Sequence, residues 1–241
     1  MDYRTIRPAR FDQGAGAEPA IPASELLLDD IELRVVGSLV EKETTTPDYY
    51  PLTLNALVSA CNQKSSRDPV VSYTSEEVSA TLDRLREKDL ATEIRSNDGG
   101  RVSRYRHLFL ERFQLNRSEA AMLCVLMLRG PQTTREIRGR SSRLYEFESS
   151  ADVEQSIALL AQEEPRPFVV KLPRVPGTKE SRYAHQLGGE VDVSELAIAE
   201  PVASQEPRAD RVSTLEHELD DVKQRLADLE RQFEDFRRLL E

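Results

Sequence analysis

The chain has 241 residues, enough for two small domains with further segments, and its formal net charge is −10. That sign argues against a general nucleic-acid-binding protein, but most of the acidic excess lies in residues 188–241. Two cysteines, Cys61 and Cys124, are too few for a disulfide framework or a zinc site, and their apolar neighbours predict buried thiols. No apolar run could span a bilayer and the N-terminus has no signal-peptide core, so we expect a soluble cytoplasmic protein without membrane contacts.

Residues 24–112 follow a lead segment, residues 1–23, whose composition predicts disorder. They predict a domain of three helices and a β-ribbon. The third helix has the clearest signal, because Thr74 and Glu77 form a capping box. Apolar residues behind that cap recur at helical spacing: Val78, Leu82 and Leu85. The apolar period then changes to two, and the turn-forming run Asn97–Gly100 predicts a hairpin.

The order of three helices and a ribbon is that of the winged helix-turn-helix fold. Such domains most often bind DNA, with the third helix in the major groove and the ribbon beside it. They also serve as protein-interaction modules, so the fold alone does not decide the function.

Two helices precede the capping box. The first is predicted to begin after Asp29 or Asp30 and to end before Glu43–Pro51, where two prolines and three threonines predict an ordered loop. Thr53 is the expected N-cap of the second helix. The polar run Asn62–Asp68 has two interpretations: its side chains contact nucleic acid, or they cap the second helix and close the turn.

Residues 115–187 predict a second domain that repeats the first. Ser118 is the expected cap of its first helix. The two copies share the pattern Ser-Arg-Tyr-x-His, in which His107 and His185 are equivalent and are expected to be structural. We therefore predict an α+β, mainly α fold made of tandem winged helix-turn-helix domains.

Residues 188–210 predict an acidic linker, and residues 211–241 predict a coiled-coil helix. Apolar residues occupy every a and d position of its heptads: Val212, Leu215, Leu219, Val222, Leu226, Leu229, Phe233, Phe236 and Leu240. Opposite charges at the flanking g and e positions favour a parallel homodimer. A trimer or tetramer, and a lone helix folded back onto a winged domain, remain alternatives.

No enzyme signature is present in the sequence. There is no Gly-rich phosphate loop, no His-Glu-x-x-His and no Gly-x-Ser-x-Gly, and the three histidines have no ligand-spaced partners. We predict a non-enzymatic protein with no catalytic residues, no metal site and no cofactor.

Basic residues provide candidate contacts to nucleic acid. They are Lys64, Arg67, Arg101, Arg104, Arg106, Arg129, Arg135, Arg138, Arg140 and Arg143. Those on the ribbon would meet phosphate or the minor groove. Against this, both presumed recognition helices carry carboxylates, which would repel the DNA backbone. These are Glu76, Glu77, Asp83 and Glu87 in the first, and Asp152 and Glu154 in the second.

Several motifs together resemble the YceH-like family of uncharacterised bacterial proteins. In the first half these are Glu41-Lys42, Thr46-Pro47, Tyr50–Leu57 and Cys61–Val70, and in the second half Leu126–Thr133, Pro173-Arg174, Pro176-Gly177 and Ser181–His185. The similarity covers about residues 26–187. It implies two winged-helix domains and a cytoplasmic location, and it implies no activity.

Two hypotheses follow for the function. The first is a DNA-binding protein with a regulatory or nucleoid role, which contacts double-stranded DNA through its basic wing and second-helix surfaces. The alternative is an adaptor that binds a protein partner and is made bivalent by the coiled coil, without nucleic-acid binding.

Overall fold

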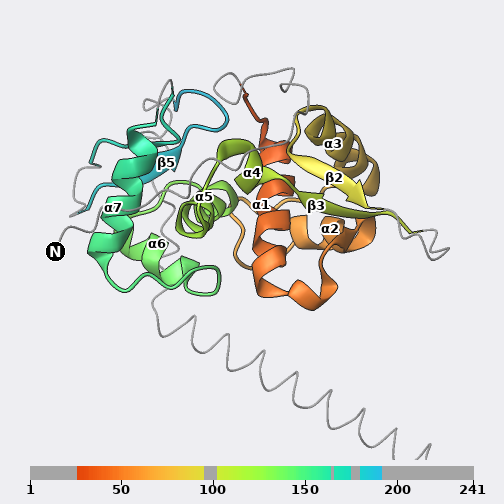
Figure 1. Cartoon of the computed structure of the whole chain (residues 1–241), viewed down its shortest axis with the longest axis horizontal. Coiled ribbons are helices and arrows are strands. Elements are labelled where there is room, and N and C mark those ends of the chain that lie inside the picture. Colours follow the sequence, from red (N-terminus) through yellow and green to blue (C-terminus); the bar gives the residue numbers. More distant parts are fainter. Residues whose placement is uncertain (1–25, 95–101, 164–165, 175–179, 192–241) are drawn as a thin grey trace, which may run out of the picture. The chain divides into compact units, whose positions relative to one another are not determined.

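The computed structural model describes residues 26–94, 102–163, 166–174 and 180–191, of which about half are helical (Figure 1). The predicted lead segment, the hairpin turn with Arg101, the linker beyond residue 191 and the coiled coil lie outside the described residues. Among the described helices, none is both long and apolar enough to cross a membrane.

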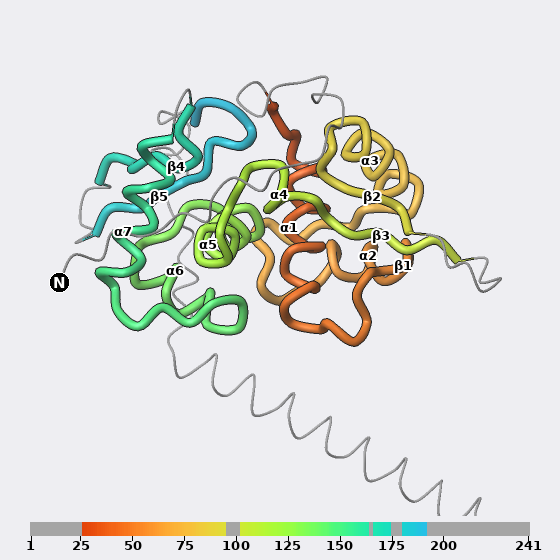
Figure 2. Tube along the Cα trace, in the orientation of Figure 1, coloured from red at the N-terminus to blue at the C-terminus, as the bar shows by residue number. Residues whose placement is uncertain are grey.

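The first half of the described chain contains three α-helices and a small antiparallel sheet. Its elements are α1 (Asp30–Thr45), the 3-10 helix η2 (Pro47–Tyr49), β1 (Leu52–Thr53), α2 (Leu54–Cys61), α3 (Ser75–Glu87), β2 (Ala91–Ile94) and β3 (Arg104–His107). The strand order is β1-β3-β2, and Tyr105 of β3 pairs with Leu52 on one side and Glu93 on the other (Figure 2). The pairing of β1 with the ribbon was not predicted.

Local capping explains where the helices of this half begin. Thr74 caps α3 in a capping box, as predicted, and of the two predicted caps of α1 it is Asp29 that caps the helix, also in a capping box. The loop predicted over residues 43–51 was placed too early in the chain, because α1 continues through Thr45. The hydroxyls of Thr45 and Thr46 donate to carbonyl oxygens of the last turn, so only Pro47 interrupts the helix.

The second half repeats the order of three helices and two strands. Its elements are α5 (Arg117–Arg129), α6 (Thr134–Ser141), α7 (Ser150–Ala161), β4 (Val169–Lys171) and β5 (Tyr183–His185). The prediction of Ser118 as the cap of α5 was wrong: Asn116 is the cap, and its side chain accepts from the backbone N–H of Glu119. Ser118 instead donates its hydroxyl to Asn116.

A short helix that was not predicted, α4 (Phe109–Phe113), connects the two halves. Its aromatic rings form a continuous row into the second half. The ring of Phe113 lies 5.2 Å from that of Phe109 and 5.3 Å from that of Phe168, in both cases edge to face. This row fastens the connector to both sides of the molecule.

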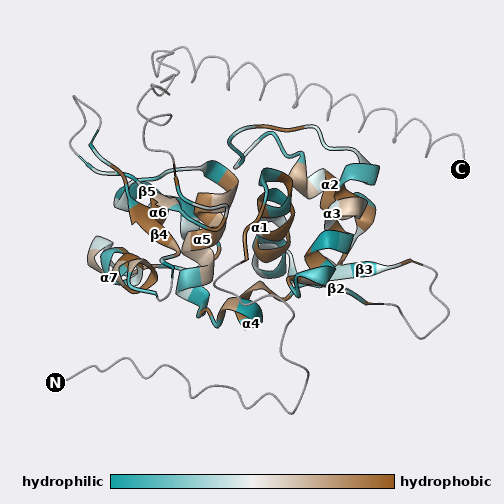
Figure 3. Ribbon diagram, turned by 90° about the horizontal axis from the view of Figure 1, so that it is seen from above, coloured by the Kyte–Doolittle hydropathy of each residue, from teal (hydrophilic) through white to brown (hydrophobic). Residues whose placement is uncertain are grey.

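The core is centred on α1 and α5, which pack against each other. Every residue from Glu32 to Val40 and from Glu119 to Leu128 is buried. Figure 3 shows α1 lying between α5 on one side and α2 and α3 on the other. The sequence analysis assigned residues 24–112 and 115–187 to two domains, whereas the structure joins the described residues of both in one compact unit with a shared core.

A basic groove between the two halves

A groove with a volume of about 460 Å³ lies where α1 and α5 end. Figure 1 shows the lower end of α1 beside the loop that follows α6. Four of the lining side chains are cations, namely Lys42, Arg129, Arg140 and Arg143, and one is a carboxylate, Glu41. Polar side chains from the loop after α2 line it as well: Gln63, Ser65 and Ser66. We call this site the basic groove.

The carboxylate of the groove is already paired with a cation behind it. Arg67 donates from its two terminal nitrogens to the carboxylate oxygens of Glu41, at 2.7 and 3.1 Å. Its guanidinium also donates to the carbonyl oxygen of Ala60, at the end of α2. The Arg67 side chain is fully buried, so the prediction that it contacts nucleic acid was wrong. It neutralises Glu41 and caps α2 instead.

The loop after α2 is held in place by further hydrogen bonds. The side-chain amide of Asn62 donates to the backbone carbonyl oxygen of Tyr73 and accepts from the backbone N–H of Tyr73, both at 2.8 Å. The backbone N–H of Asp68 donates to the carbonyl of Leu128 across the two halves, at 2.9 Å. Of the two interpretations of residues 62–68, the structural one therefore holds for Asn62 and Arg67, whereas Lys64 is exposed.

Two of the candidate arginines of α6 serve the structure as well. Arg138 donates to the carbonyl oxygens of Phe147 and Glu148, at 3.2 and 2.7 Å, and so fastens the loop between α6 and α7. Arg140 forms an ion pair with Glu136 at 3.4 Å and donates to the side-chain oxygen of Gln132. Only a part of each guanidinium remains for a ligand.

The remaining candidate cations of residues 62–68 and 129–143 lack such partners among the described residues. Within residues 26–94, 102–163, 166–174 and 180–191, the side chains of Lys64, Arg129, Arg135 and Arg143 form no hydrogen bond or ion pair. Arg129 is half-buried, and its burial, together with the positive charge of Arg140, lowers the pKa of its guanidinium. The groove thus concentrates positive charge that the described protein does not compensate.

The wing arginines that the structure describes are exposed or half-exposed and partly engaged. Arg104 donates to the carbonyl of Pro51 at 2.8 Å, and Arg106 pairs with Glu111 at 3.3 Å. Arg101 lies outside the described residues.

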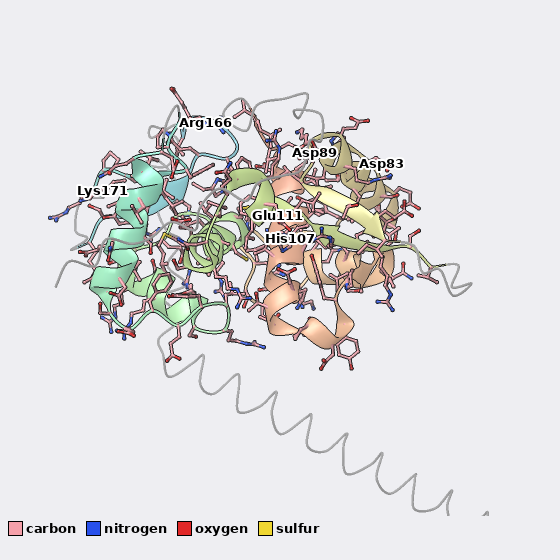
Figure 4. All side chains as sticks on the ribbon, in the orientation of Figure 1. Asp83, Asp89, His107, Glu111, Arg166 and Lys171 are labelled. Atoms are coloured by element: carbon pink, nitrogen blue, oxygen red, sulfur yellow. The ribbon has the colours of Figure 1, made fainter. Side chains whose placement is uncertain are left out.

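Helix α3, the presumed recognition helix, is a poor surface for DNA. The basic side chains of α3 and of Lys88, which follows it, form ion pairs with carboxylates of the protein. Arg84 pairs with Asp29 and Glu32, Lys88 with Glu32, and Arg86 with Asp83. The carboxylates of Glu76 and Glu87 remain exposed. Figure 4 places Asp83 and Asp89 by α3, at the other side of the view from α6. The acidic and basic surfaces are therefore separate.

The two equivalent histidines have structural surroundings. His107 lies 3.0 Å from the carboxylate of Glu43 through Nε2, and its Nδ1 accepts from the backbone N–H of Phe109. This arrangement places the proton of the neutral ring on Nε2, and the hydrogen bond lowers the pKa of Glu43. Burial lowers the pKa of His185 to about 4 and raises the pKa of Cys61 to about 11. Neither group is activated for chemistry at neutral pH.

No cluster of three or more histidine, cysteine, aspartate or glutamate side chains suited to a metal ion occurs among the residues with a described position. The chemistry available at the basic groove is the binding of anions. Gln63, Ser65 and Ser66 belong to the polar run for which contact with nucleic acid was one interpretation, whereas Lys42 was not among the predicted contacts and joins the arginines because α1 packs on α5.

These features define the class: an α+β protein, about half helical, with small antiparallel sheets and a basic groove between its halves. The chain belongs to the family described as "Protein of unknown function, DUF480", which matches residues 28–178. This agrees with the resemblance to a family of uncharacterised bacterial proteins that the motifs indicated.

Relatives of high similarity occur in several bacteria. A "UPF0502 protein" of Opitutus terrae is 52% identical over 205 residues, which cover 85% of this chain and 85% of the relative. The corresponding protein of Citrifermentans bemidjiense is 50% identical over 195 residues, covering 81% and 89%. That of Solibacter usitatus is 47% identical over 214 residues, covering 89% and 98%.

Proposed function

We propose that the protein is a non-enzymatic, cytoplasmic DNA-binding protein with a regulatory or nucleoid role, built from two winged helix-turn-helix units. The repeated order of three helices and two strands supports the units. The observation that carries DNA binding is the set of exposed cations without partners in the described structure: Lys64 from the first half, and Arg135 and Arg143 from the second. Charges of this kind are suited to DNA phosphates.

The contacts would be mainly to the backbone of DNA. The acidic surface of α3 would repel phosphates, so this helix is not suited to enter the major groove. Phosphate contacts fix position and carry no sequence information directly. Binding of this type would be weakly selective and strongly dependent on salt.

The experiment measures the affinity for mixed-sequence double-stranded DNA over a range of salt concentrations. Charge reversal of Arg135 and Arg143 together should weaken binding and reduce the slope of log affinity against log salt by about 2. Lys171→Glu serves as the control, because Lys171 is exposed in β4, away from α6 (Figure 4). Equal affinity and slope in the double variant and the unchanged protein would reject this interface.

A second candidate function, a protein-interaction adaptor, is favoured by the exposed carboxylates of α3. Glu76, Asp83 and Glu87 would attract a basic segment of a partner, and the expected coiled coil would make the adaptor bivalent. Recovery of a stoichiometric protein partner that is lost in Glu76→Lys with Glu87→Lys, without DNA binding, would favour this function.

A further inference from the structure

We propose that the basic groove is a binding site for a small ligand with a diphosphate group. This ligand site goes beyond DNA binding and does not depend on it. The inference rests on the uncompensated charge, the free hydrogen-bond donors and the dimensions of the groove.

The charge balance of the groove favours a compact anion with several charges. Glu41 is neutralised from behind by Arg67, and Arg140 is partly neutralised by Glu136. Three cations then remain: Lys42, Arg129 and Arg143. Lys42 forms a long ion pair with Glu41, 3.7 Å between Nζ and Oε2, but this one carboxylate is already bound by Arg67 at 2.7 Å, so a net positive charge remains. A diphosphate carries roughly three negative charges near neutral pH and would balance them.

The partial burial of Arg129 increases the need for an opposite charge beside its guanidinium. Arg129 is half-buried at the end of α5 without an ion-pair partner among the described residues. A charge that is partly removed from water is unfavourable unless an opposite charge or acceptor meets it. A phosphate group offers the guanidinium two acceptor oxygens in the geometry that arginine prefers. A ligand anion would therefore complete the surroundings of Arg129.

The groove also offers donors that the described protein leaves unused. The hydroxyls of Thr45 and Thr46 are occupied by carbonyl oxygens of α1. By contrast, the side chains of Gln63, Ser65 and Ser66 form no hydrogen bond within the part of the chain that the structure describes. These donors line the same groove as the cations. Arg67 and Asn62 fix the loop that carries them.

The size of the groove fits a small ligand. Its volume of about 460 Å³ lies within the range of small-molecule sites. A DNA duplex is far wider and would contact exposed side chains outside the lining, such as Lys64 and Arg135. Gly139 leaves the wall of α6 open, since a Cβ atom there would meet nothing within 4 Å. The phosphate chemistry is shared by both ligands, so the experiment has to separate them.

Isothermal titration calorimetry of the full chain with sodium pyrophosphate tests the site, in a chloride buffer of constant ionic strength without phosphate or sulfate. We expect saturable binding of one pyrophosphate per chain. Arg143→Gln and Arg129→Gln should each weaken it by about tenfold. Arg135→Gln is the matched control, because Arg135 lies in α6 outside the groove and should leave the affinity unchanged. Equal losses in Arg135→Gln and Arg143→Gln would overturn the proposal.

A second pair of variants guards against effects on folding. Gly139→Asp should abolish binding by adding a negative charge to the wall, whereas Gly139→Ala should keep it, and the Cβ atom that both add meets nothing within 4 Å. Sulfate that competes as well as pyrophosphate would show general anion attraction and would overturn the diphosphate site. Loss of DNA binding in the Arg135 and Arg143 reversals has no bearing on the Gly139 result, so the two proposals can fail separately.

Discussion

The thiol of Cys124 donates a hydrogen bond to the carbonyl oxygen of Gly37 across 3.3 Å, where α5 crosses α1. The close approach leaves little room for a side chain at position 37: a Cβ atom there would lie 3.0 Å from Cδ2 of Leu128 and 3.4 Å from Cβ of Met127. This crossing holds the two halves in contact and so sets the distance between the walls of the basic groove.

A larger side chain at this crossing should destabilise the whole described unit. Gly37→Val would push the two buried helices apart, and we expect a loss of about 1–3 kcal/mol in the free energy of unfolding. Urea denaturation followed by circular dichroism measures it. Gly139→Ala is the control, because open space surrounds that helical position, and it should stabilise the protein by about 0.5–1 kcal/mol. An unchanged midpoint for Gly37→Val would contradict the close packing.

Removing one partner of the ion pair between Arg67 and Glu41 should be costly. Arg67→Met leaves the half-buried Glu41 carboxylate with only its longer ion pair to Lys42, and we expect a loss of about 3–5 kcal/mol in the free energy of unfolding. The double variant Arg67→Met with Glu41→Met should lose clearly less, since the half-buried carboxylate is removed together with Arg67. A double-mutant cycle in urea tests this coupling, and additive effects would show that the pair is not coupled.

The buried histidine predicts a loss of stability in acid. The pKa of His185 is about 4 in the folded state, below its ordinary value of 6.5, so the unfolded state binds the proton more readily. The stability is therefore complete above pH 6.5 and falls as the pH drops from 6.5 towards 4, by roughly 1–3 kcal/mol. His185→Gln should flatten this part of the stability profile in urea denaturation at a series of pH values. Parallel profiles would rule out His185 as the origin.

The coiled coil stays a prediction of the sequence. If residues 211–241 form a parallel homodimer, light scattering coupled to size exclusion should give twice the mass of one chain. Leu226→Glu places a charge in the predicted seam and should produce the monomer, because a charge buried in a coiled coil is unfavourable. Arg231→Glu changes charge outside the apolar a and d positions and should retain the dimer. A monomeric unchanged protein would disprove the pairing.

Local signals predicted the fold better than the site. Thr74 and Asp29 cap their helices as expected, since a cap depends on residues within one turn. The prediction of Ser118 as a cap was wrong because Asn116, two residues earlier, is an equally good cap and pairs with Glu119. The role of Arg67 was missed for a different reason. Its partner Glu41 is distant in the sequence, and only the tertiary packing removes this charge from the surface.

The basic groove shows the same limit. The cluster from Arg129 to Arg143 was visible as a run of positive charge. The sequence could not show which of these arginines bind other parts of the protein and which are left for a ligand. In the structure Arg138 fastens a loop, whereas Arg143 is left without a partner among the described residues. Lys42 joins them only because α1 packs on α5. Sites of this kind arise between segments and have no local pattern.

The mutual burial of α1 and α5 has a practical consequence for work with fragments of the chain. Each helix is the main packing neighbour of the other, so a polypeptide that ends before Asn116 would expose the hydrophobic face of α1 that α5 covers. Such a truncated product is expected to aggregate or to recruit a second copy of itself as a substitute cover. Expression and dissection of this protein should therefore cut the chain outside residues 26–191.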